Sequence, residues 1–114
     1  MKYVLLVFAL TSALCADAPT LFRQCQICHG KYAEKPMGSR IAPSSLTKDQ
    51  MSYALIKYRE NHQTSSGNAK IMSTNVRHFT DKDIEDISIY IKELQEQRKA
   101  EQEAQAAEKL KSLE

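Results

Sequence analysis

The chain has 114 residues, 26% of them charged, and a formal net charge of +2. This length allows one domain and no more, and the small net charge leads us to expect no nucleic-acid partner. With no Trp and a mean hydropathy of −0.49, the apolar core must be small. Chains of this size usually need a staple, a metal or a cofactor to complete their core.

Residues 1–16 have the pattern of a secretory signal peptide. Lys2 supplies a positive start, and the apolar run over residues 4–14 is shorter than the roughly 20 residues of a membrane span. We therefore predict export, with cleavage after Cys15 or Ala16. A retained membrane anchor is the alternative. A lipoprotein anchored at Cys15 is disfavoured, because the preceding Leu14 is bulky where such signals have a small residue.

Two helices are predicted in the first half of the remaining chain. The first begins at Pro19 and Thr20 and stops at Gly30. Thr47 and Gln50 form a capping box at the start of the second, because each side chain can satisfy the other's free backbone N–H. The apolar face of the second helix holds Met51, Ala54, Leu55 and Tyr58. Residues 61–68 then read as a turn-rich loop, and residues 71–79 are ambiguous.

A last helix is predicted after a second capping pair, Thr80 and Asp83. Its apolar stripe, at steps of three and four, consists of Ile84, Ile87, Ile91 and Leu94. Residues 95–114 keep strong helix formers but lose the stripe, so they either extend the helix into solvent or fray. Without a convincing strand pattern, we predict an all-α domain over residues 17–94 and a polar extension over residues 95–114.

The segment Cys25-Gln26-Ile27-Cys28-His29 carries the chemistry. If Cys15 leaves with the signal, two thiols remain, and a disulfide across two intervening residues would restrain almost no chain. Cys-x-x-Cys-His is the attachment signature for c-type haem, in which each thiol adds to a vinyl group and the imidazole ligates the iron. A thioredoxin-type pair would need a βαβ context. A zinc site would need four ligands. The sequence has no second pair of cysteines, although His62 and His78 could in principle contribute.

Around this motif, residues 19–94 resemble the short bacterial class I cytochromes c. The similar segments are CQICHG, MGSRIAPSS, LTKDQMSYALIKYREN, a loop containing Gly67 with KIM, and FTDKDIEDISIYIKEL. The resemblance implies three to four helices around one haem c, covalently attached through Cys25 and Cys28. It also implies that the N- and C-terminal helices cross, with Phe22 and Tyr90 as the aromatic pair at the contact.

The resemblance further implies an iron ligated by His29 and by a Met sulfur from a loop shortly before the last helix. Met72 fits that place, whereas Met37 lies too close to His29 and Met51 belongs to the apolar face of the second helix. The rival ligands are His62 and His78, and an open site is the remaining possibility. In the family a backbone carbonyl, often of a Pro, fixes the proximal imidazole. Both Pro36 and Pro43 are available, with the context of Pro43 slightly better.

These features imply a periplasmic electron-transfer protein rather than an enzyme. We expect a monomer, with no membrane insertion after signal cleavage, that passes single electrons between a quinol-oxidising complex and a terminal oxidase or peroxidase. Residues 17–80 carry nine basic and four acidic side chains, and residues 81–114 carry six and ten. The basic half either steers an acidic partner or is an ordinary surface.

Two alternatives to the electron carrier stay open. One is a haem sensor or peroxidase-like protein with an open or His-ligated distal site. The other is a docking role for the extension, whose thin apolar stripe consists of Ala100, Ala104, Ala107 and Leu110.

Overall fold

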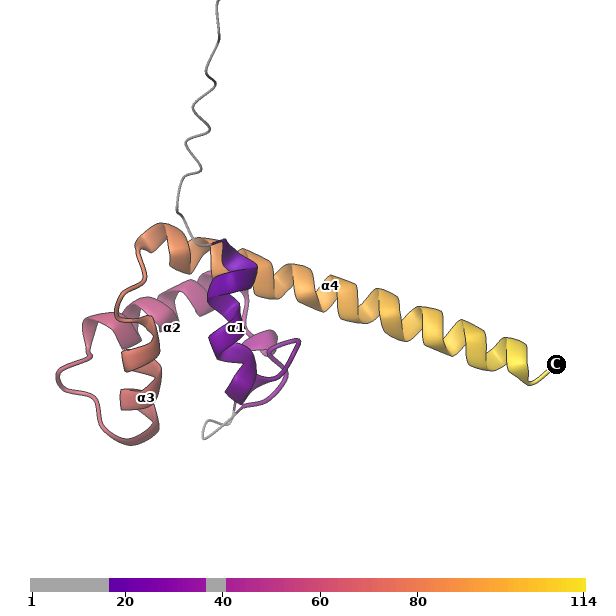
Figure 1. The fold of residues 1–114 in the computed structure, drawn as a ribbon, viewed down its shortest axis with the longest axis horizontal. Coiled ribbons are helices and arrows are strands. Elements are labelled where there is room, and N and C mark those ends of the chain that lie inside the picture. Colours follow the sequence, from indigo (N-terminus) through magenta and orange to yellow (C-terminus); the bar gives the residue numbers. More distant parts are fainter. Residues whose placement is uncertain (1–16, 37–40) are drawn as a thin grey trace, which may run out of the picture.

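A computed structural model describes residues 17–36 and 41–114, so the predicted signal peptide, Cys15 and Met37 lie outside the described residues. The elements are α1 (Ala18–His29), a short 3-10 turn η1 (Pro43–Ser45), α2 (Lys48–Glu60), α3 (Gly67–Val76) and α4 (Asp81–Ser112). Within the described ranges there is no strand, which confirms the all-helical prediction. Figure 1 shows α1, α2 and α3 gathered around the first half of α4.

The helices begin where side chains satisfy their free backbone N–H groups. Asp17 caps α1 by accepting a hydrogen bond from the Thr20 amide at 3.2 Å. Both predicted capping boxes are present, at Thr47 with Gln50 and at Thr80 with Asp83. These local interactions explain why the sequence alone located the starts of α2 and α4.

The crossing of α1 and α4 forms the centre of the apolar core. Phe22 of α1 is 1% exposed, and its ring meets that of Tyr90 edge to face, with centroids 5.7 Å apart. The predicted aromatic pair is therefore confirmed. The predicted stripe on α4 is also buried: it consists of Ile84, Ile87, Ile91 and Leu94. Burial of these side chains against α1 and α2 fixes the direction of α4.

The segment before α4 differs from the prediction. Met72 was expected on a loop, but it lies in the middle of α3, which starts at Gly67. The segment GNAKIMSTNV is rich in poor helix formers and has no side-chain N-cap bond, so its local sequence hardly favours a helix. The helix is stabilised by packing instead, because Ser73 and Val76 are almost completely buried.

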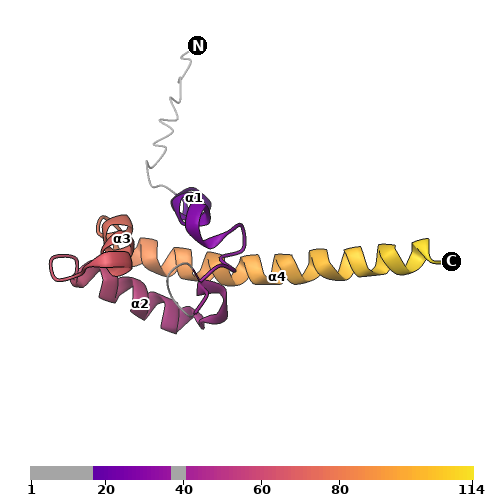
Figure 2. The same ribbon diagram turned by 90° about the horizontal axis from the view of Figure 1, so that it is seen from below.

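Helix α4 continues without interruption to Ser112, so the extension is helical rather than frayed. Figures 1 and 2 show its last turns projecting away from the other helices. Every residue after Glu101 is exposed, including Leu110 and Leu113. Within residues 17–36 and 41–114, no helix combines the length and apolar composition needed to cross a bilayer.

Candidate functional site

His29, the last residue of α1, is held in one orientation. The residue is 9% exposed, and its Nδ1 lies 2.8 Å from the backbone oxygen of Lys35. Since a carbonyl only accepts, Nδ1 carries the proton and Nε2 keeps a free lone pair with which to bind a metal. The resemblance offered the carbonyls of Pro36 and Pro43, with Pro43 slightly favoured and neither assigned. The acceptor is instead the carbonyl of Lys35, immediately before Pro36.

A tight loop after α1 brings this carbonyl back to the imidazole. Gly30 ends the helix at a φ of +83°, and a Cβ there would overlap the Glu34 carboxylate. Ala33 is fully buried with a φ of +56°, and the Lys35 amide donates to the His29 oxygen at 2.9 Å. The chain therefore reverses within six residues, and both polar backbone atoms of Lys35 face His29.

Cys25 and Cys28 lie on the same helix and are free, half-buried thiols. Burial raises the pKa of the Cys25 thiol to about 11, so that thiol stays protonated at neutral pH. Reactive pairs in thiol oxidoreductases work through a thiolate of lowered pKa. The surroundings of Cys25 therefore do not fit thiol–disulfide exchange. Ile27, between the two cysteines, is 85% exposed and faces away from the core.

Two adjoining cavities open between α1, α2 and α3. The first, of about 140 Å³, is lined by Gln24, Cys25, Cys28, His29, Asn68, Ile71, Met72, Asn75 and Val76. The second, of about 460 Å³, is lined by His29, Ile41, Pro43, Leu46, Met51, Ala54, Leu55, Tyr58, Asn68, Ala69 and Met72. They share His29, Asn68 and Met72, so His29 and Met72 border both spaces.

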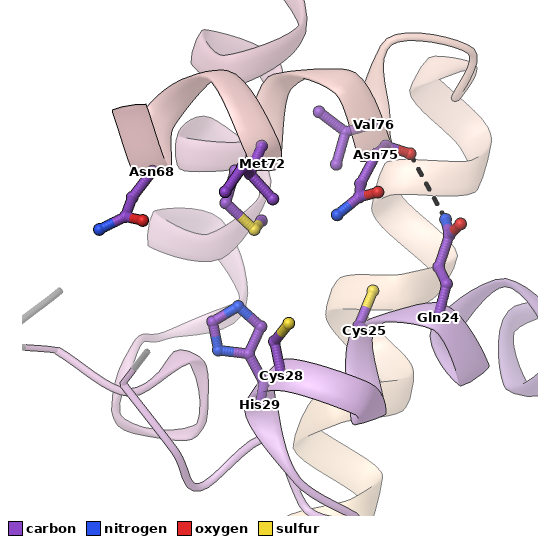
Figure 3. Close-up of a pocket in the computed structure, with 9 residues that line it drawn as sticks. Gln24, Cys25, Cys28, His29, Asn68, Met72, Asn75 and Val76 are labelled. Atoms are coloured by element: carbon purple, nitrogen blue, oxygen red, sulfur yellow. Dashed lines mark hydrogen bonds between the residues drawn. The ribbon is translucent and has the colours of Figure 1, made fainter. Parts of the chain in front are cut away.

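The predicted site residues gather at the first cavity from two helices. Figure 3 shows the Met72 side chain of α3 directed across the space toward the His29 ring, with both cysteine sulfurs at the His29 side. The Gln24 side chain donates to the backbone oxygen of Asn75 at 3.4 Å and joins α1 to α3 at the edge of the cavity (Figure 3). One wall thus presents two thiols and an imidazole, and the other presents a thioether.

The rival ligands His62 and His78 line neither cavity. Nδ1 of His62 lies 2.7 Å from the hydroxyl of the buried Ser73, and desolvation together with the nearby cations Lys70 and Arg77 lowers its pKa. His78 is exposed and accepts a hydrogen bond from Arg77. In the described part of the chain, no three His, Cys, Asp or Glu side chains gather as a metal ion would require.

Several contributors to the site were absent from the prediction, among them the Lys35 carbonyl and the side chains of Gln24, Asn68 and Asn75. The asparagines would have been found had residues 67–76 been recognised as a helix, since they lie four before and three after Met72 and hence on its face. Met51 was assigned to the core and is buried there, but it also lines the second cavity.

No known family model matches this sequence, and no curated protein matches it either.

Proposed function

We propose that this chain is a class I cytochrome c that carries single electrons in the periplasm. One haem c would be attached through Cys25 and Cys28, and His29 and Met72 would ligate its iron. The observation that carries the proposal is the arrangement around the first cavity. Two thiols and an imidazole nitrogen with a free lone pair face a thioether from another helix.

The residues present fit such a group. Its attachment needs two thiols near one another, and Cys25 and Cys28 lie one helical turn apart beside the proximal imidazole. Its apolar ring needs apolar walls, and the second cavity is lined mainly by carbon, with Leu46, Met51 and Leu55 among its residues. Its volume of about 460 Å³ falls within the range of roughly 300–1,000 Å³ that is usual for ligand pockets.

When bound, the haem would supply a one-electron Fe(III)/Fe(II) couple. The protein residues would orient the iron ligands and set the reduction potential. The bond from His29 to the Lys35 oxygen makes the imidazole more basic and prevents its rotation. Ligation by the Met72 thioether would raise the reduction potential relative to a second histidine and would leave no vacant position for a substrate. This arrangement serves electron transfer, with a quinol-oxidising complex and a terminal oxidase or peroxidase as the proposed partners.

A peroxidase-like protein or a gas sensor is the competing proposal, and it requires a vacant or displaceable distal position. Peroxide chemistry also requires an acid–base group beside the bound oxygen. The described residues that line the two cavities include no carboxylate, and their one histidine is His29, whose Nδ1 is already bonded to Lys35. The lining therefore supports the carrier better than the enzyme.

The test is the visible spectrum of the protein expressed with a periplasmic haem-attachment system. The carrier requires covalently bound haem, and in the oxidised state the long-wavelength absorption band of a Met–Fe(III) bond. Met72→Ala should abolish that band and allow carbon monoxide to bind the reduced haem. His78→Ala and Met51→Leu should keep the band. If the wild-type protein lacks the band, or if His78→Ala removes it, the Met72 assignment is wrong.

A further inference from the structure

The first turns of α4 beyond Leu94 lie against the loop that follows α1. Gln95, Arg98 and Glu101 are half-buried and lie at steps of three on one face of the helix, although they are polar. From residue 102 onward every side chain is exposed. The extension therefore has two parts, and the part nearer the core has a partner within the chain.

That partner is Tyr32. The Gln95 side-chain amide donates to the Tyr32 backbone oxygen at 2.6 Å, and the same nitrogen donates to the Ile91 oxygen at 3.1 Å. The Tyr32 hydroxyl donates to the Glu101 carboxylate. The Arg98 guanidinium lies over the Tyr32 ring, 5.7 Å from its centroid. Three side chains on one face of α4 thus contact the backbone, the ring and the hydroxyl of a single residue.

Tyr32 lies in the middle of the loop that sets the orientation of His29. Its amide donates to Glu34 at 2.9 Å, and the amide of the next residue, Ala33, donates to the Gly30 oxygen at 3.1 Å. The opposite side of the loop is held by the Ser44 amide, which donates to the Ala33 oxygen at 3.0 Å. A displacement of Tyr32 would therefore shift Lys35, whose carbonyl accepts the hydrogen bond from His29 Nδ1–H.

We propose that Gln95, Arg98 and Glu101 of the C-terminal extension are positioning residues for His29. They hold Tyr32, and through the loop over residues 30–35 they keep the Lys35 carbonyl directed at the imidazole. This role rests on the proposed function, because it matters only if His29 ligates a metal. It gives the near part of the extension a task at the candidate site, separate from any docking by the exposed part.

The main measurement is NMR of the reduced, haem-loaded full chain, following solvent exchange of the His29 Nδ1–H proton. Gln95→Ala removes the bond to Tyr32 and should accelerate this exchange about fivefold, as expected for the loss of one hydrogen bond. Tyr32→Phe, which removes the bond to Glu101, should act in the same direction. The reduction potential should rise in both variants, because a weaker bond to Lys35 makes the imidazole less basic.

The matched controls are Gln102→Ala, at an exposed position of the same helix, and Tyr53→Phe, at a tyrosine that is 64% exposed. Neither should change the exchange rate or the potential. If Gln95→Ala and Gln102→Ala exchange equally fast, the positioning role is overturned even though the haem is bound.

A second measurement keeps the inference testable if no haem is attached. Amide hydrogen exchange at Ala33 and Lys35 of the haem-free chain reports on the loop itself, since these amides bond to Gly30 and His29. Exchange at both amides should be faster in Gln95→Ala than in Gln102→Ala. Equal exchange rates in the two variants would overturn the proposal that Gln95 holds the loop. If no haem is attached but exchange is faster in Gln95→Ala, the proposed function is rejected, while the contact between α4 and the loop is still shown to hold the loop.

Discussion

The two walls of the cavity are built in different ways. The wall with His29 is a regular helix whose end is fixed by Gly30, a buried turn at Ala33 and the bond to Lys35. The wall with Met72 is the helix over residues 67–76, which has no side-chain N-cap bond and poor helix propensity. The helix of the first wall is determined by its local sequence, whereas the helix of the second depends on packing. We therefore expect the two walls to respond differently to substitution, acid and local unfolding.

The largest difference should come from the attachment residues. Replacing both thiols, as Cys25→Ser with Cys28→Ser, should eliminate covalently bound haem. Met72→Ala should leave the haem attached, because Met72 forms no covalent bond to a haem vinyl group. Haem staining after denaturing electrophoresis measures this directly. Ile27→Ala, between the two cysteines and 85% exposed, is the control and should retain the haem. Covalent haem in the double variant would contradict the proposed site.

Next in size is the cost of removing the apolar anchors of each wall. Phe22→Ala, at the crossing of α1 and α4, should lower the free energy of unfolding by about 3–5 kcal/mol. Val76→Ala, which anchors α3, should cost about 2 kcal/mol. Urea unfolding followed by circular dichroism gives both values, with the exposed Ile71→Ala as the control for α3. A greater loss at Val76 than at Phe22 would mean that α3, rather than the crossing, is the stronger part of the fold.

A smaller difference is expected between the two glycines with positive φ. Gly30→Ala should cost more than Gly67→Ala, because its Cβ would meet the Glu34 carboxylate, whereas a Cβ at Gly67 meets nothing within 4 Å. Backbone strain adds to this difference, because Gly30, with a φ of +83° and a ψ of 169°, lies in a region that is essentially restricted to glycine, at a cost of about 1–3 kcal/mol for another residue. The free energies of unfolding of the two variants test this. Measured against Glu34→Ala alone, which also loses the bond from the Tyr32 amide, the added Gly30→Ala should cost less than it does in the wild-type chain. An equal cost in both backgrounds would remove the steric explanation.

The smallest effect should be the pH response of the α3 wall. The neutral ring of His62 accepts from Arg77 at Nε2 and donates to Ser73 at Nδ1, and desolvation and nearby cations lower its pKa below the ordinary 6.5. Below pH 6.5 the unfolded chain therefore binds more protons at His62 than the folded chain does, and stability falls as the pH is lowered. Above pH 6.5 this contribution is fully present.

His62→Gln should make the free energy of unfolding less steeply dependent on pH below 6.5. Measuring unfolding by urea at several pH values shows it, with His78→Gln as the matched control on an exposed histidine of the same region. An unchanged slope in His62→Gln would mean that folding does not lower the pKa of His62.

The sequence alone was informative wherever structure depends on neighbours along the chain. Capping at Thr47 and Thr80, the helix stop at Gly30 and the stripe on α4 were all predictable, because each rests on residues within one or two turns. The spacing of Cys25, Cys28 and His29 is likewise local, and it determined the chemistry that was proposed. The Phe22–Tyr90 contact was anticipated only through the resemblance.

Tertiary structure decided what joins distant segments. That residues 67–76 form a helix, with Met72 facing His29, depends on burial of Ser73 and Val76 and is not apparent from local propensity. The choice of the Lys35 carbonyl depends on a loop whose shape is held by Ser44 and by Tyr32. The contacts of Gln95, Arg98 and Glu101 with Tyr32 span more than sixty residues of sequence. Such contacts follow from how buried faces meet, and the periodicity of one segment carries no information about the segment that will cover it.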